Sequence, residues 1–79
     1  ARARSESTGA GGDGLSPNAR ARLRLFGRNL RAARVLAELS QRELHERSGI
    51  AQSHISELER ALTIPKLDTI SDLADVLGV

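Results

Sequence analysis

The feature that most constrains the fold is a glycine, Gly49, set between two short stretches of helical pattern. Upstream, Ser40 and Glu43 form the S-x-x-E pattern of a capping box, which predicts a helix beginning after Ser40 and running to about Ser48. Glycine adopts the left-handed backbone conformation at little cost, so Gly49 predicts a tight turn. A second short helix, over residues 52–61, follows almost at once.

Residues 41–60 therefore have the organisation of a helix-turn-helix unit, whose second helix commonly enters the DNA major groove. Leu44 on the first helix and Ile55 and Leu58 on the second predict a common apolar side. The other side of the second helix is polar and has no run of lysines. Such a face suits contacts with the edges of bases.

Two further helices are predicted around this unit. The first covers residues 18–37, with Ser16 as N-cap and Pro17 at its first position. The last covers residues 67–77. Helical spacing gives inward faces for both. They consist of Leu23, Phe26, Leu30, Ala33 and Ala37 in the first helix, and Ile70, Leu73, Ala74 and Leu77 in the last. Gly27, inside the first pattern, predicts close contact with another helix or the true start of a tight helix.

Composition excludes several classes of function. The 79 residues are enough for one small domain, and they include no cysteine and two histidines without HExxH spacing. We therefore expect no metal, no cofactor and no catalytic residues. The single aromatic residue, Phe26, leaves no stacking platform for single-stranded nucleic acid. No apolar run approaches the roughly 20 residues that span a bilayer, so a cytoplasmic protein without a membrane partner is expected. If the helix-turn-helix unit binds DNA, the protein is expected to be nucleoid-associated.

Charge divides the chain into two parts. Residues 1–36 carry eight arginines against two acidic residues, and residues 37–79 carry four basic residues against eight acidic ones. The two parts carry +6 and −4, which gives the net charge of +2. A basic front part fits contact with phosphates, whereas the acidic part would face away from DNA. A solvated arginine-rich segment is the alternative.

Residues 1–17 are rich in glycine, serine and alanine, and such a segment cannot bury enough surface to offset its ordering entropy. We expect a disordered or flexible tail there and a folded domain over residues 18–79. Arg2 and Arg4 could form an arm that enters the minor groove. We favour the simpler interpretation that they belong to a linker.

Four elements in this order resemble the Xre/Cro family of lambda-repressor-like DNA-binding domains. They are LSQREL, the Ser48-Gly49-Ile50 turn, Ile55-Ser56-x-Leu58-Glu59 and the closing LADVLGV. The resemblance covers about residues 25–79. It implies an all-α, lambda-repressor-like helix-turn-helix bundle with four helices visible and a fifth missing or beyond the chain end.

The resemblance also implies a set of DNA-binding residues. They are Gln41, Gln52, Ser53, His54, Ser56, Glu57, Arg60 and Lys66. Gln41 matches the glutamine that binds a phosphate and supports the third helix, whereas Gln52, Ser53 and Glu57 match base-reading positions. Gln52 can bond adenine bidentately, and Glu57 can accept from cytosine N4 or repel wrong sequences.

The remaining positions match supporting contacts. His54 and Ser56 fall where phosphate or water contacts are expected, and Arg60 and Lys66 flank the loop that lies along the sugar-phosphate backbone. Arg34 matches an arginine of the first helix that forms a structural ion pair with the glutamate at Glu59. The resemblance therefore implies that this pair stabilises the domain rather than binding DNA.

The helix-turn-helix unit departs from the family pattern at two positions. His45 stands where alanine is preferred, so either the helices separate slightly or the imidazole lies along the groove and bonds a neighbour. We favour a structural histidine over a pH switch. Ala51 replaces the usual Ser or Thr N-cap of the recognition helix, which loses about 1 kcal/mol of capping energy.

Other departures lie at helix ends. Glu38 replaces a glycine that often ends the first helix. Ala61 and Leu62 replace a glycine-basic pair, which predicts that the third helix continues further and that the phosphate contact there is weaker. Leu62 and Ile64 are then either core residues or an exposed apolar contact, and we favour the core. The missing fifth helix often contributes to the dimer interface of the family.

The leading hypothesis is a sequence-specific double-stranded-DNA-binding transcriptional regulator of bacterial or phage type. It would bind an inverted repeat as a homodimer, most simply as a repressor. The sequence does not distinguish it from an antitoxin, a restriction-modification controller or part of a larger regulator, and any effector is unknown. The alternative is a protein-interaction module on the same fold, favoured by the acidic Glu57 on the recognition face.

Overall fold

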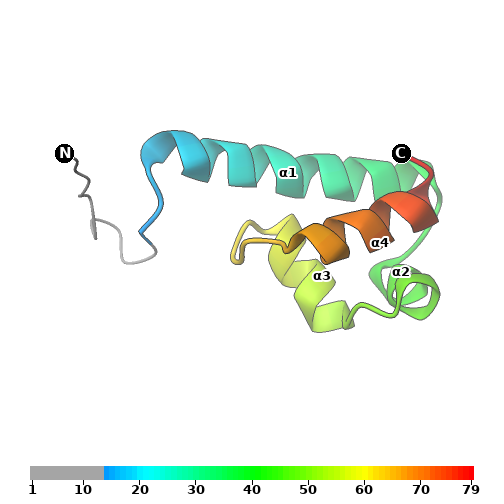
Figure 1. Ribbon diagram of the computed structural model, residues 1–79. Helices are drawn as coiled ribbons and strands as arrows, with labels where there is room; N and C mark the ends of the chain where they lie inside the picture. Colours follow the sequence, from blue (N-terminus) through cyan, green and yellow to red (C-terminus); the bar gives the residue numbers. More distant parts are fainter. Residues whose placement is uncertain (1–13) are drawn as a thin grey trace.

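Residues 14–79 fold into four α-helices connected by short loops (Figure 1). The computed structural model describes residues 14–79, and no strand occurs among them. The helices are α1 (Pro17–Leu36), α2 (Gln41–Ser48), α3 (Gln52–Glu59) and α4 (Leu67–Leu77). The expected all-α class is confirmed. No helix in this part of the chain is long and apolar enough to cross a membrane.

The predicted flexible tail lies almost wholly outside the described residues, as do Arg2 and Arg4. Its last residues belong to the helix start instead. Ser16 is the N-cap of α1, with its hydroxyl accepting from the backbone N–H of Ala19 at 3.1 Å, and Pro17 is the first helical residue.

The start of α2 is the predicted capping box. The Ser40 hydroxyl accepts from the Glu43 N–H at 3.0 Å, and the Glu43 carboxylate accepts from the Ser40 N–H at 2.8 Å. The bond from the Ser40 backbone N–H, assisted by the Ser40 side chain, holds the pKa of Glu43 below its ordinary value, because it favours the charged carboxylate. By contrast, α3 begins at Ala51 without a side-chain cap, as expected from that residue.

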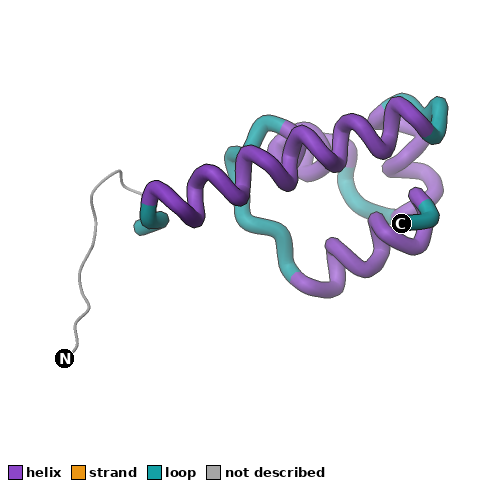
Figure 2. Tube along the Cα trace, turned by 90° about the horizontal axis from the view of Figure 1, so that it is seen from above, coloured by secondary structure: helices purple, strands orange, loops and turns teal. Residues whose placement is uncertain are grey.

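The helices enclose one small aliphatic core. α1 packs against α3, and α2 packs against both α3 and α4. The buried side chains are Leu30, Leu39, Leu44, Ile55, Leu58 and Leu73. Figures 1 and 2 show that the N-terminal part of α1 extends well past α3 and α4, so the helix covers the core from about Phe26 onward.

Gly27 marks the closest approach of α1 to α3. A Cβ atom built on Gly27 would lie 2.7 Å from the carbonyl oxygens of both Leu58 and Glu59. This is shorter than real Cβ contacts allow, and backbone atoms cannot rotate away as a side chain can. The close helix contact predicted from the sequence is therefore present.

The end of α3 differs from the prediction. The helix ends at Glu59 rather than at residue 61, and Ala61 has a left-handed backbone with φ of 59°. The Ala61 and Leu62 N–H groups donate back to the carbonyls of Leu58 and Glu57, at 3.1 and 2.9 Å. This is the hydrogen-bond pattern of a Schellman motif, completed without its usual glycine.

The same motif ends α1. The N–H groups of Glu38 and Leu39 donate to the carbonyls of Val35 and Arg34, and Glu38 has φ of 60°. The helix consequently ends at Leu36, and Ala37 is exposed rather than part of the apolar face.

The preference for Leu62 and Ile64 as core residues is wrong. Their exposed fractions are 62% and 59%, because the left-handed turn at Ala61 takes the chain out of the helical path that would have directed them inward. Ile70, predicted to point inward on α4, is also partly exposed at 36%.

The Gly27→Ala variant is expected to be destabilised by about 1–3 kcal/mol, because a methyl group there forces α1 away from α3. The sign of the change in stability is informative, because replacing glycine by alanine in an uncrowded helix stabilises by up to about 1 kcal/mol. Urea denaturation would measure the change. Arg28→Ala, at the adjacent exposed position, serves as the control; an equal or greater stability of Gly27→Ala would contradict the close contact.

Ala61→Gly is expected to stabilise the domain by about 0.5–1 kcal/mol. Glycine removes a left-handed penalty of about 1–2 kcal/mol but adds unfolded-chain entropy. Ala37→Gly is the matched control, because Ala37 also ends a helix but has an ordinary φ of −80°. That change should destabilise, and thermal denaturation of both variants would reveal the opposite signs.

Candidate nucleic-acid interface

The carboxylate of Glu59, at the end of α3, joins three elements beneath the candidate interface. It accepts hydrogen bonds from Arg34 Nε at 2.6 Å and Nη2 at 3.1 Å, and from Gln41 Nε2 at 3.1 Å. The side chain of Glu59 is 5% exposed and that of Arg34 12%. These contacts fix the direction of α3 relative to α1 and to the start of α2.

A further nitrogen of the Arg34 guanidinium group also donates within this network. Its Nη1 donates to the carbonyl oxygen of Leu39 at 2.9 Å, which ties the loop after α1 to the ion pair. The hydrogen bond to Glu59 raises the pKa of Arg34 above its ordinary value, although partial burial acts in the opposite direction. Arg34 is thus a structural side chain in this fold.

Gln41 lies where the network meets solvent. It is half-buried, and one of its two amide hydrogens is directed to Glu59. An amide nitrogen carries two donors, so the second can still be offered to a phosphate oxygen. The geometry is compatible with both parts of the role expected for Gln41.

The turn before α3 is held by local hydrogen bonds. Gly49 has φ of 78°, and its N–H donates to the carbonyl of His45 at 2.9 Å. The Ile50 N–H donates to the Ser48 hydroxyl at 3.1 Å, and His45 Nδ1 donates to the Ile50 carbonyl at 2.7 Å. A carbonyl can only accept, so Nδ1 carries the hydrogen. His45 therefore bonds a neighbour, the second of its two expected arrangements.

The exposed side of α3 carries the polar residues predicted to read bases. Gln52, Ser53 and Glu57 are exposed, whereas His54 and Ser56 are half-buried. His54 Nδ1 lies 3.8 Å from the Glu57 carboxylate, an ion pair only when the imidazole is protonated. The structure thus brings together two side chains that the sequence assigned to separate contacts.

Arg60 and Lys66 stand at the two ends of the loop between α3 and α4. Both are exposed, but Arg60 Nε donates to the Ser56 carbonyl of its own helix at 3.3 Å. Arg60 is therefore partly directed along α3, while Lys66 is the N-cap residue of α4 and forms no side-chain capping bond.

The sequence did not reveal two of these supporting contacts. The first is the carbonyl of Leu39, since a backbone acceptor leaves no trace in the residue type. The second is the Ser48 hydroxyl, for which a signal did exist: serine two residues before an N–H in a turn commonly accepts from it.

Replacing Arg34 by Ala is expected to cost about 3–5 kcal/mol, because Glu59 would remain buried without its charged partner. The double variant Arg34→Ala/Glu59→Ala should lose less than the sum of the single changes, a coupling that urea denaturation of all four proteins would measure. Arg42→Ala is the control. It breaks an exposed pair with Glu46, whose side chains are 78% and 57% exposed, so little change is expected. Equal losses for Arg34→Ala and Arg42→Ala would contradict the supporting role.

Comparison with known proteins identifies a matching family and several relatives. The Helix-turn-helix family matches residues 30–79. The HTH-type transcriptional regulator y4dL of Sinorhizobium fredii is 50% identical over 50 residues, which cover 63% of this chain and 26% of that protein. Rv0474 of Mycobacterium tuberculosis, also named an HTH-type transcriptional regulator, is 40% identical over 63% of this chain and 36% of its own length.

A shorter relative matches over most of its length. The HTH-type transcriptional regulator y4dJ of Sinorhizobium fredii is 39% identical over 56 residues, 71% of this chain and 73% of that protein. The chain thus spans about a quarter to a third of the first relatives but most of y4dJ. Together with the four-helix fold, these matches show that the chain belongs to the Xre/lambda-repressor-like helix-turn-helix family.

Proposed function

We propose that the domain is a sequence-specific reader of double-stranded DNA that represses transcription. The observation that carries this proposal is the polar face of α3, formed by Gln52, Ser53 and Glu57, on a helix whose last residue, Glu59, is held by a buried network. A reader must hold such side chains in a fixed direction, because base contacts depend on hydrogen-bond geometry. The network supplies that rigidity by fixing the C-terminal end of α3 to α1 and α2.

In this mechanism α3 enters the major groove with its N-terminal residues directed to the base edges. Gln52 donates to N7 and accepts from N6 of an adenine, while Gln41 donates its second amide hydrogen to a phosphate. Glu57 accepts from a cytosine amino group when His54 is neutral, and protonated His54 competes for the same carboxylate. Lys66 and Arg60 add phosphate contacts at the ends of the loop.

We further propose that the domain acts as a homodimer on an inverted repeat. An apolar groove of about 140 Å³ lies open between α1 and α4, lined by side chains that include Phe26, Leu30, Leu73 and Leu77. Burial of this groove by a second copy would remove apolar surface from water. Two copies of α3 would then meet major grooves about 34 Å apart, and repression would follow from blocking polymerase at the chromosome.

The groove also favours a second candidate function, a module that binds another protein. The two functions differ in what they require of α3. A protein-binding module needs no sequence preference for DNA, whereas a regulator does.

Gln52→Ala is expected to cost about 1–3 kcal/mol of binding free energy on the preferred site and to relax the preference at one base pair. Selection from a genomic duplex library, followed by titration of the recovered site, would measure both effects. Ser71→Ala on the exposed side of α4 is the control and should leave binding unchanged.

Lys66→Ala should instead weaken binding to all duplexes alike. It should also reduce the slope of log affinity against log salt concentration by about one. An absence of any enriched sequence with the unmodified protein would reject the reader and support the protein-binding module. Enriched single half-sites without a repeat would reject the dimer alone.

A further inference from the structure

α1 carries more charge than its packing role requires. Its 20 residues include six arginines and no acidic residue. The family match begins at residue 30, so residues 17–29 lie upstream of it. This upstream part holds Arg20, Arg22, Arg24 and Arg28. Its residues before the Gly27 contact belong to the half of α1 that projects past the bundle (Figure 2). The family match therefore does not account for these arginines.

Three exposed arginines form a line along one edge of α1. Arg24, Arg28 and Arg31 follow one another at steps of four and three residues, so they share one side of the helix. We call them the arginine stripe. Gly27 and Arg34 continue the same spacing, and these two residues contact the C-terminal end of α3. The stripe therefore runs along the edge of α1 that borders α3.

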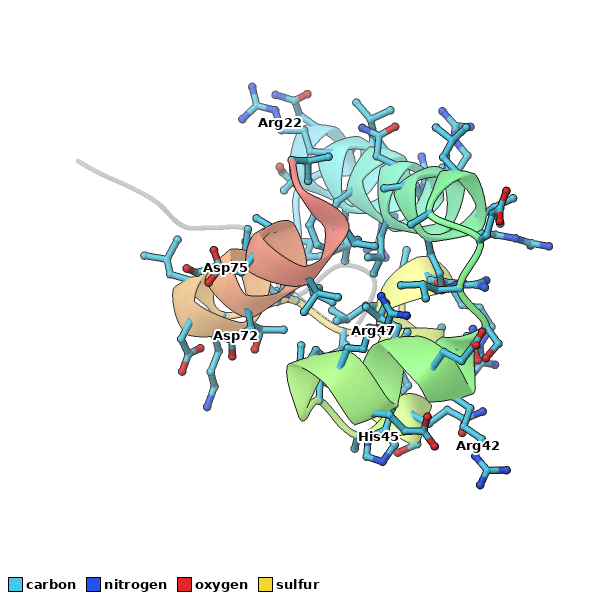
Figure 3. All side chains as sticks on the ribbon, turned by 90° about the vertical axis from the view of Figure 1, so that its right-hand side faces the viewer. Arg22, Arg42, His45, Arg47, Asp72 and Asp75 are labelled. Carbon is cyan, nitrogen blue, oxygen red and sulfur yellow. The ribbon has the colours of Figure 1, made fainter. Side chains whose placement is uncertain are left out.

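The opposite edge of α1 faces α4. Arg22 lies about 160° around the helix from Arg24 and lines a surface pocket with Phe26 and Ile64. In Figure 3, Arg22 lies on the same side of the molecule as Asp72 and Asp75 of α4, whereas Arg42, beside Gln41 at the start of α2, lies on the other side. The acidic residues of α4 are thus separated from the stripe.

Within the chain, the stripe is electrostatically unfavourable. Arg24 and Arg28 are four residues apart, a spacing at which like charges repel. None of the ion pairs formed within residues 14–79 involves Arg24, Arg28 or Arg31. A line of positive charge without internal compensation fits a polyanion that binds outside.

We propose that the arginine stripe is a second, sequence-independent contact with DNA, which binds phosphates flanking the base pairs that α3 reads. This inference rests on the proposed function. Residues 17–26, which precede the Gly27 contact, extend about 15 Å at 1.5 Å per residue, a length that carries Arg24 beyond the C-terminal end of α3. Each neutralised phosphate releases counterions, so the stripe raises affinity and salt dependence without altering base preference.

The test compares two double variants of the full chain that remove the same charge. Arg24→Gln/Arg28→Gln removes two members of the stripe, and Arg22→Gln/Arg47→Gln removes two arginines elsewhere. Binding is titrated at several salt concentrations to two probes: the duplex recovered by selection, and a mixed-sequence duplex of about three helical turns. Circular dichroism verifies that both variants fold.

The stripe variant should reduce the slope of log affinity against log salt by about two on both probes. The ratio of the two affinities should stay unchanged, the control should keep the original slope, and Arg24→Lys/Arg28→Lys should restore it. An unchanged slope in the stripe variant, or an equal reduction in the control, would overturn the proposed contact between the arginine stripe and DNA. Failure of the unmodified protein to bind either probe would instead reject the proposed function, and binding to both without preference would reject only sequence reading.

Discussion

The rest of the structure depends on one buried carboxylate. Glu59 ends α3 and accepts from Arg34 of α1 and from Gln41 of α2, so a single side chain fixes the angles among three helices. A small aliphatic core cannot do this alone, because leucine and isoleucine contacts tolerate sliding and rotation, whereas a forked guanidinium–carboxylate pair has a defined geometry. The helix-turn-helix arrangement is therefore specified by these polar contacts in addition to the hydrophobic core.

The close contact at Gly27 works together with this network. With no side chain at Gly27, the last carbonyls of α3 approach the α1 backbone, and the Arg34 side chain two turns later reaches Glu59. A helix that approached less closely would leave that carboxylate in solvent, where an ion pair contributes little. On one side of α1, the absence of a side chain at Gly27 and the long side chain of Arg34 thus both hold the end of α3 close to α1.

The sequence predicted most of the fold but not its irregular ends. The Ser40–Glu43 capping box and the spacing of Leu44, Ile55 and Leu58 are local signals, and they placed α2 and the inward side of α3 correctly. The predicted end of α3, at residue 61, was wrong. Ala61 adopts a left-handed backbone, and an alanine in the sequence does not indicate that conformation. The predicted DNA contacts are of a third kind: the residue types and the resemblance suggested them, and without a bound duplex they stay predictions.

The way in which α3 is held also bears on those contacts. Its C-terminal end is fixed by Glu59, by the Gly27 contact and by the Schellman hydrogen bonds of Ala61 and Leu62. Its N-terminal end has no side-chain cap at Ala51. The N–H groups of a first helical turn attract anions, and recognition helices direct this end toward DNA. In the proposed mode of DNA binding, the anchored end of α3 would lie farthest from the bases. The uncapped N–H groups after Ala51 would then be free to donate to the DNA backbone.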